Sequence, residues 1–129
     1  MVENNSPLPE AFYQGLSAYN AKMFFLAHEL FEDAWRKTAE DSRNFYRALL
    51  HLSGGFFRLT QNRPHAARKF FSHAIKWLDQ TPKSFQGFET DDVKSRVRSL
   101  LTAIHQNNDC DQILQDMFFT IQPNRENAQ

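Results

Sequence analysis

The stretch Met23–Lys37, which reads MFFLAHELFEDAWRK, decides the fold that we expect for this chain. On a helix, residues three or four positions apart share one face, so His28, Glu32 and Trp35 project together among phenylalanine rings. A histidine and a carboxylate among aromatic side chains are costly to bury unless each finds a polar partner. The stretch therefore predicts a helix whose aromatic side packs against other helices that also supply polar groups.

A more polar stripe lies beside this face and carries Glu29, Asp33 and Arg36. We interpret it as the solvated side of the helix, with an ion pair between Asp33 and Arg36, which lie one turn apart. A solvated stripe of this kind needs no functional explanation.

Apolar residues at helical spacing recur on both sides of this stretch. A first helix is predicted over Pro9–Asn20, and a third begins at a cap formed by Asp41 or Ser42 and ends near Thr60. The break Gln61–Pro64 separates the third helix from a fourth, which reads HAARKFFSHAIKWL. These four helices are expected to form two hairpins.

Two further helices are predicted after a loop that contains Pro82 and Gly87. Thr90 can cap the fifth, Asp91–Gln106, whose apolar stripe comprises Val93, Val97, Leu100, Leu101 and Ile104. The sixth covers Cys110–Phe119, and its inward side chains are expected to be Ile113, Leu114, Met117 and Phe118. No segment shows the alternation of a β-strand with comparable strength.

These elements predict an all-α fold, a compact bundle of five to six helices built from two antiparallel helical hairpins plus C-terminal helices. A chain of 129 residues has the usual size of one domain. We expect that domain at residues 9–121, with a flexible N-terminus at 1–8 and a frayed tail at 122–129. The 13 phenylalanines predict a core built largely from aromatic rings.

The composition argues against several classes of protein. No run approaches the roughly 20 apolar residues of a membrane-spanning helix, and the first ten residues lack the basic and apolar regions of a signal peptide. We therefore expect a soluble, cytoplasmic protein with no membrane contact. The single cysteine, Cys110, fits a reducing compartment, and we expect no catalytic role for it.

Charge is distributed unevenly, although the formal net charge is zero. Residues 1–41 hold seven acids and three bases, whereas Ser42–Leu78 holds seven bases and no acid. We expect the acidic segment to pack against the basic one and neutralise it. Nucleic-acid binding is the less favoured alternative, and it would use Arg58, Arg63, Arg68, Lys69 and Lys76.

One face of the predicted third helix carries Arg47, His51, Gly54, Gly55 and Arg58. The two glycines leave room for a neighbouring helix, which we expect to be the helix over Met23–Lys37. Arg47 and His51 would then meet the face that carries His28 and Glu32. The sequence thus predicts a buried structural network of His28, Glu32, Trp35, Arg36, Arg47 and His51.

A metal or acid/base site is the alternative interpretation of the same region. Two imidazoles and one or two carboxylates, from His28, Glu29, Glu32 and His51, could hold a divalent cation or move a proton. The motif lacks the second histidine of H-E-x-x-H, and the Arg47 guanidinium would repel a bound cation. We therefore favour the structural network and expect neither a metal nor a cofactor.

The segment Phe24–Arg36 resembles the signature of domain-of-unknown-function family 309: an aromatic pair, Ala-His-Glu, two apolar positions, Glu, and Trp-Arg. The family's later blocks resemble Leu49-Leu50, Gln61-Asn62, Ala66-Ala67 and Phe85–Phe88. The chain departs from the pattern at Lys22 and Gln61, where the family has glycine, and at His51, where glutamine is common. The resemblance covers about residues 9–106. It implies a compact all-helical fold and no established activity.

The sequence favours a non-enzymatic domain that binds a partner protein or a second copy of itself. The two predicted hairpins loosely resemble tetratricopeptide units, which can bind peptides, although the full repeat consensus is absent. The alternative is a small metal-dependent or acid/base hydrolase that uses His28, Glu32 and His51, with Glu29 as a further candidate.

Overall fold

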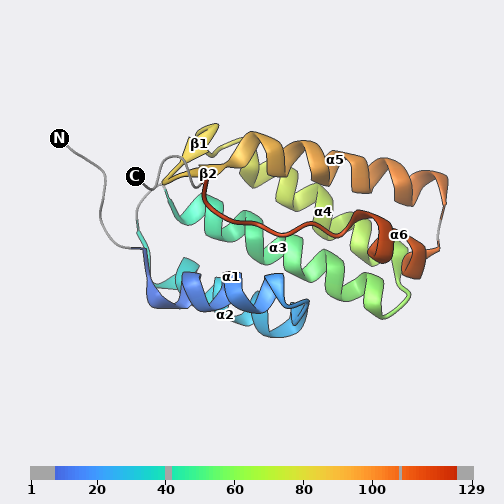
Figure 1. The fold of residues 1–129 in the computed structure, drawn as a ribbon, viewed down its shortest axis with the longest axis horizontal. Coiled ribbons are helices and arrows are strands. Elements are labelled where there is room, and N and C mark those ends of the chain that lie inside the picture. Colours follow the sequence, from blue (N-terminus) through green and yellow to red (C-terminus); the bar gives the residue numbers. More distant parts are fainter. Residues whose placement is uncertain (1–7, 40–41, 108, 125–129) are drawn as a thin grey trace.

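The computed structural model describes residues 8–39, 42–107 and 109–124. Six helices and one two-stranded hairpin make up the described chain, which confirms the all-α prediction (Figure 1). In chain order they are α1 (Glu10–Asn20), α2 (Phe24–Arg36), α3 (Arg43–Thr60), α4 (Pro64–Leu78), β1 (Ser84–Phe85), β2 (Phe88–Glu89), α5 (Thr90–Gln106) and α6 (Cys110–Met117).

The first four helices form the two predicted hairpins. The α1–α2 turn contains Lys22 at φ 64°, and the α3–α4 turn contains Asn62 at φ 58°. This left-handed backbone favours glycine and tolerates asparagine. The chain keeps the turn with a lysine whose amine lies 5.0 Å from the centroid of the Phe118 ring.

Neither Ser42 nor Thr90 caps its helix as predicted. Ser42 precedes α3, but its backbone is already helical and its side chain makes no capping hydrogen bond. Asp41, the other candidate, lies outside the described residues. Thr90 is the first residue of α5, and its hydroxyl donates to the carbonyl of Pro82 instead of accepting from the helix. That bond ties the start of α5 to the preceding loop.

The loop before α5 folds into the small β1–β2 hairpin, which the sequence did not predict. Ser84 pairs with Glu89 and Phe85 with Phe88, and the turn between them uses Gln86 at φ 52° and Gly87 at φ 87°. Strands of two residues are too short to show an alternating pattern, so the helix-based analysis missed them.

The aromatic core that the sequence predicts is confirmed. Phe12 of α1 packs against the rings of Phe31, Phe45, Tyr46 and Phe88, at centroid distances of 5.1–6.1 Å. A second group surrounds Phe56 of α3, and it comprises Tyr19, Phe24, Phe71, Phe118 and Phe119. Edge and tilted contacts of this kind add to the stabilisation that burial provides.

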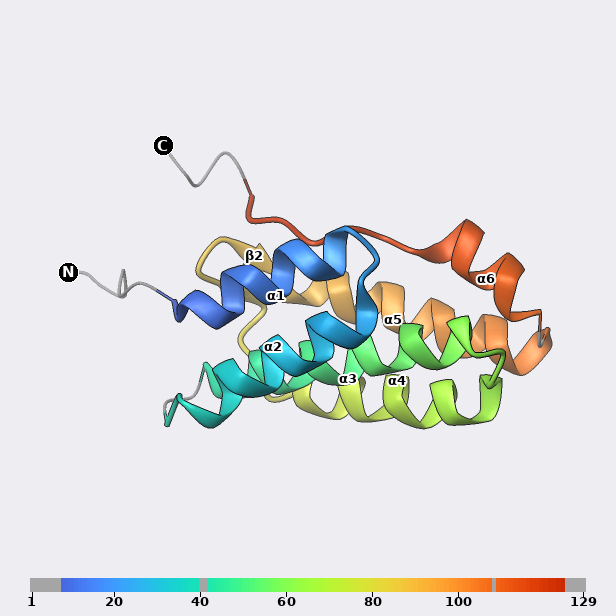
Figure 2. The same cartoon turned by 90° about the horizontal axis from the view of Figure 1, so that it is seen from below.

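The chain beyond α6 runs back along the bundle toward β2 (Figures 1 and 2). The helix ends at Met117, two residues earlier than predicted, because Phe118 takes an extended backbone. The Tyr19 hydroxyl then donates to the carbonyl of Phe119 at 2.8 Å, and the Asn20 amide makes two hydrogen bonds with the Ile121 backbone. The backbone N–H of Asn124 donates to the carbonyl of Gly87. This C-terminal segment, residues 118–124, connects α1 to the β-hairpin.

Of the described helices, none combines the length and the apolar character needed to cross a membrane.

Candidate functional site

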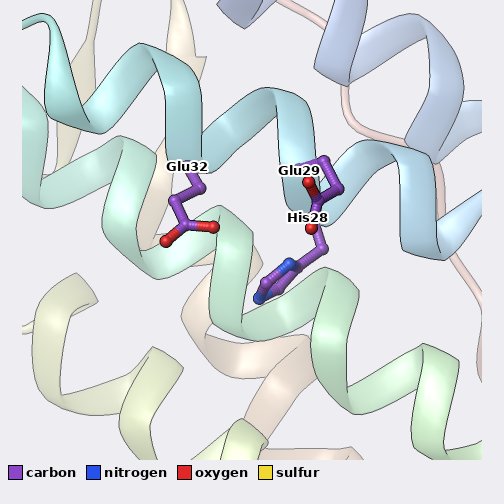
Figure 3. Close-up of side chains that lie close together, drawn as sticks. All are labelled: His28, Glu29 and Glu32. Carbon is purple, nitrogen blue, oxygen red and sulfur yellow. The ribbon is translucent and has the colours of Figure 1, made fainter.

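Three side chains of α2 form a potential ligand group. His28, Glu29 and Glu32 each offer one ligand atom, and these atoms lie within 4.8 Å of one another. Figure 3 shows the His28 and Glu32 side chains reaching from α2 toward α3. His28 and Glu32 are half-buried and Glu29 is exposed. Positions i, i+1 and i+4 of one helix therefore bring an imidazole and two carboxylates together at the surface.

The carboxylate of Glu32 is bound within its own helix. Arg36 donates to it at 3.0 Å, one turn further along α2. In the part of the chain that the structure describes, no ion pair joins Glu32 to Arg47, so that part of the predicted network is wrong. The predicted pair between Asp33 and Arg36 is also wrong, because Asp33 binds Lys37 at 3.0 Å. Both carboxylates find partners four residues later, the favoured spacing for Glu or Asp before a base.

Arg47 contacts two indole rings in place of Glu32. Its guanidinium carbon lies 4.9 Å from the ring centroid of Trp35 on α2 and 4.1 Å from that of Trp77 on α4. The guanidinium carbon of Arg43, one turn earlier on α3, lies 4.9 Å from Trp35. We call Arg43, Trp35, Arg47 and Trp77 the cation–aromatic series. It joins α2, α3 and α4 through cation–π contacts instead of through ion pairs.

His51 lies next to a third histidine, His73 of α4. Its ring centroid is 5.3 Å from that of His73 on α4 and 6.1 Å from that of Phe70. Burial, with smaller electrostatic contributions from His73, Arg47 and His28, lowers the pKa of His51 from 6.5 to about 4. His51 is therefore neutral near pH 7. Its Nδ1 atom is buried and has no hydrogen-bond partner.

The glycines of α3 face α4, where the sequence analysis expected α2. A Cβ added at Gly54 would meet the Phe70 ring, and one added at Gly55 would meet the Phe71 ring. The phenylalanines of α4 fill the space that the missing side chains leave, so α3 and α4 approach closely. Helical spacing gave the correct face of α3 but not the neighbour that covers it.

The basic segment is not neutralised as predicted. Among the described residues, no carboxylate forms an ion pair with any of its seven bases, which are Arg43, Arg47, Arg58, Arg63, Arg68, Lys69 and Lys76. Arg58 instead donates to the side-chain oxygen of Gln61 at 2.7 Å, and Arg68 contacts His65 at 3.1 Å. Glu32 and Asp33 pair instead with Arg36 and Lys37, one turn further along the chain, so no described carboxylate forms an ion pair with the bases of α3 and α4.

Cys110 is buried, and burial raises the pKa of its thiol, with Asp111 and Asp109 acting in the same direction. A raised thiol pKa disfavours the reactive thiolate. The structure thus gives a physical reason for the expectation that Cys110 has no catalytic role.

The sequence analysis missed Arg43, His73 and Trp77 as members of this region. Their spacing could have indicated them, since Arg43 lies four residues before Arg47 and Phe70, His73 and Trp77 share a face of α4. Two hollows of the described surface lie elsewhere. One of about 480 Å³ is lined by α5 and Met117, and one of about 200 Å³ by β2, α5 and the C-terminal segment. Neither is lined by a candidate residue.

Comparison with known proteins places part of the chain in a family. No curated protein matches the chain. Residues 12–70 match the sequence model of the family described as Domain of unknown function (DUF309). The match includes α2 and α3, with His28, Glu32, Trp35, Arg47 and His51, and ends before the resembling block Phe85–Phe88. The resemblance to the DUF309 family seen in the sequence is thus confirmed over residues 12–70.

Proposed function

We propose that this chain is a non-enzymatic interaction domain that acts by pairing with a second copy of itself. The observation that carries the proposal is a group of exposed apolar side chains at the start of α2. Met23, Phe25 and Leu26 are 53%, 57% and 44% exposed. Exposing large apolar side chains to water is unfavourable, and burying them against a partner surface is favourable. Groups of such side chains therefore mark interaction sites.

Phe57 of α3 extends this group. Its half-buried ring lies 5.4 Å from the Phe25 ring between centroids, and the guanidinium carbon of Arg58 lies 5.7 Å from the Phe57 ring. Aromatic side chains, methionine and arginine are the residues that protein interfaces favour. We call Met23, Phe25, Leu26 and Phe57 the apolar surface.

The charges beside the apolar surface support self-association. The exposed residues Lys22 and Glu29 lie at equal distances in sequence from the midpoint between Phe25 and Leu26. In an antiparallel pairing of two copies about that midpoint, Lys22 of each copy would lie opposite Glu29 of the other. A two-fold dimer requires such self-complementarity, and the formal net charge of zero gives two copies no net repulsion.

Sedimentation equilibrium tests the proposal over protein concentrations from about 1 µM to about 1 mM, a range that spans the dissociation constants of weak to moderate dimers. We expect a monomer–dimer equilibrium that Phe25→Ser weakens by at least about tenfold. Tyr13→Ser is the matched control, because Tyr13 is 50% exposed but lies on α1.

Charge reversal gives a second readout of the same pairing. Lys22→Glu and Glu29→Lys should each weaken the dimer, and the double variant should restore it. A wild-type chain that stays monomeric over the whole range would overturn the proposal.

A second candidate function, a metal-dependent or acid/base hydrolase, is favoured by one observation: the ligand atoms of His28, Glu29 and Glu32 lie within 4.8 Å of one another. The imidazole of His51 is unprotonated near pH 7 and could accept a proton, but its pKa of about 4 makes it a weak base. The Arg36 guanidinium bound to Glu32 counts against a cation at this place.

A further inference from the structure

The cation–aromatic series holds two guanidinium groups against one indole ring. The guanidinium carbons of Arg43 and Arg47 each lie 4.9 Å from the Trp35 centroid, and Trp77 contacts Arg47 as well. A guanidinium that stacks through its face keeps its N–H donors in the plane, pointing away from the ring. The contact with the ring therefore restrains both groups without using their N–H donors in a hydrogen bond.

Neither guanidinium has a counter-ion among the described residues. Across the described ranges 8–39, 42–107 and 109–124, no carboxylate forms an ion pair with Arg43 or Arg47. Glu32, which shares the face of α2 with Trp35, is bound to Arg36. Two positive charges held on one ring repel each other, and an anion between them would relieve that repulsion.

A second observation also indicates a missing partner. The Nε atom of Arg43 is buried and makes no hydrogen bond. A buried donor that lacks a partner is costly, and a charged donor more so. The site also lies at the start of α3, where the helix has no acidic residue in its first turn and no side-chain cap from Ser42. The positive end of the helix dipole thus adds to the two arginine charges.

We infer that Arg43 and Arg47 bind an oxyanion of the phosphate class beside Trp35 and Trp77. A phosphate group is close to dianionic near neutral pH, which matches two guanidinium charges, and its oxygens accept the paired N–H donors of arginine. A carboxylate brings one negative charge, so it would leave one guanidinium uncompensated. This site lies on α3 apart from the apolar surface at the start of α2, and it does not depend on the proposed dimer.

Intrinsic fluorescence reports on this site directly. Trp35 and Trp77 are the only two tryptophans of the chain, and both contact Arg47. The titrants are inorganic phosphate and diphosphate, with chloride and acetate at matched ionic strength as controls. We expect a saturable change with the two phosphates, tighter for diphosphate, and none with chloride or acetate. Equal responses to acetate and phosphate, or a response to ionic strength alone, would overturn the assignment.

Substitutions separate this site from general attraction to a basic surface. Arg43→Met and Arg47→Met should each weaken phosphate binding by at least about tenfold, and Arg47→Lys, which keeps the charge but loses the paired donors, should also weaken it. Arg98→Met is the matched control, because Arg98 is exposed on α5 beside a different hollow. Circular dichroism and thermal melts identify any variant that fails to fold, and Arg47→Lys then serves as the milder change.

Nucleic-acid binding is the competing use of these charges. It predicts that a single-stranded oligonucleotide binds with steep salt dependence and that Lys69→Gln and Lys76→Gln weaken this binding. This result, together with no fluorescence response to phosphate, would overturn the inference.

Discussion

The imidazole rings of His51 and His73 meet edge to face between α3 and α4, with centroids 5.3 Å apart and planes at 82°. The Arg47 and His28 side chains lie near enough to act on His51 in the same direction as His73. A proton on His51 would therefore meet three other positive or protonatable groups. Burial adds to this cost, and together these effects bring the pKa of His51 to about 4.

This pairing predicts that His51 makes the fold sensitive to acid. The unfolded chain protonates His51 near pH 6.5 and the folded chain only near pH 4, so the unfolded state binds more protons between these values. The stability that neutral His51 provides is complete above pH 6.5 and is lost as the pH falls to about 4. His51→Gln, the residue common in the family at this position, should remove the effect.

Urea unfolding at several pH values measures this loss of stability. Between about pH 7 and pH 4, the wild-type free energy of unfolding should fall by about 1–2 kcal/mol more than that of His51→Gln, a value reduced for the partial exposure of the ring. His105→Gln, at an exposed position of α5, should behave like the wild type. Equal pH dependence of the wild type and His51→Gln would show that this imidazole titrates normally.

The ion pair between Glu32 and Arg36 predicts how a metal would bind to α2. The Arg36 guanidinium, which is largely exposed, occupies one of three potential ligands. Zn²⁺ titration by calorimetry should therefore show weak binding that Arg36→Gln strengthens by about threefold to tenfold and Glu32→Gln removes. Lys37→Gln is the control, because Lys37 pairs with Asp33 outside the group. Absence of Zn²⁺ binding in both the wild type and Arg36→Gln would leave the hydrolase candidate without support.

The same pair also bears on the structural role of Glu32. An exposed pair within one helix contributes at most about 1 kcal/mol, so Glu32→Gln should lower the free energy of unfolding by less than about 1 kcal/mol. A loss of about 3 kcal/mol, which a buried network would give, would mean that Glu32 has a partner beyond Arg36.

Periodicity in the sequence was enough to predict the helices and the hairpins, because each helix has an apolar stripe that must face the core. Periodicity could not predict which of several polar partners with similar interaction energies a side chain would contact. Arg47 had Glu32, Trp35 and Trp77 within its range of possible neighbours, and exposed ion pairs and cation–π contacts differ by only about 1 kcal/mol. The position of Glu32 one turn before Arg36 decided the outcome, since a partner on the same helix needs no particular packing.

The sequence analysis did not predict the β1–β2 hairpin or the course of the C-terminal segment, for a different reason. Their residues are held by contacts with distant parts of the chain and show no period of their own. Phe119 is buried beside Tyr19, one hundred positions away, through a contact between a side chain and the backbone. No local pattern encodes such a contact.

The hydrogen bond from Tyr19 to the Phe119 carbonyl predicts a measurable contribution to stability. The hydroxyl is buried, and burial raises the pKa of Tyr19 well above its usual value despite the opposing effect of Arg96. Tyr19→Phe would keep the ring and leave the carbonyl without this donor, so the free energy of unfolding should fall by about 1–2 kcal/mol. Tyr13→Phe, at an exposed position, should cost almost nothing. Equal stabilities of the two variants would indicate that water replaces the lost donor.

The contacts of α3 with α4 predict different costs for the same change at neighbouring glycines. In an open helix, Gly→Ala stabilises by up to about 1 kcal/mol. At Gly55, however, an added methyl group would collide with the Phe71 ring, which is fully buried and cannot move aside. Overpacking of this kind costs about 1–3 kcal/mol, so Gly55→Ala should be destabilising overall.

Gly54 provides the matched comparison. Its added methyl group would meet Phe70, which is only half-buried and can shift toward solvent, so Gly54→Ala should cost less than Gly55→Ala. Phe70 also lies beside His51, and its displacement would open that imidazole to water. Gly54→Ala should therefore move the pKa of His51 back toward 6.5, which NMR titration of the imidazole protons can follow. An unchanged His51 titration in a folded Gly54→Ala variant would mean that Phe70 does not keep water from the ring.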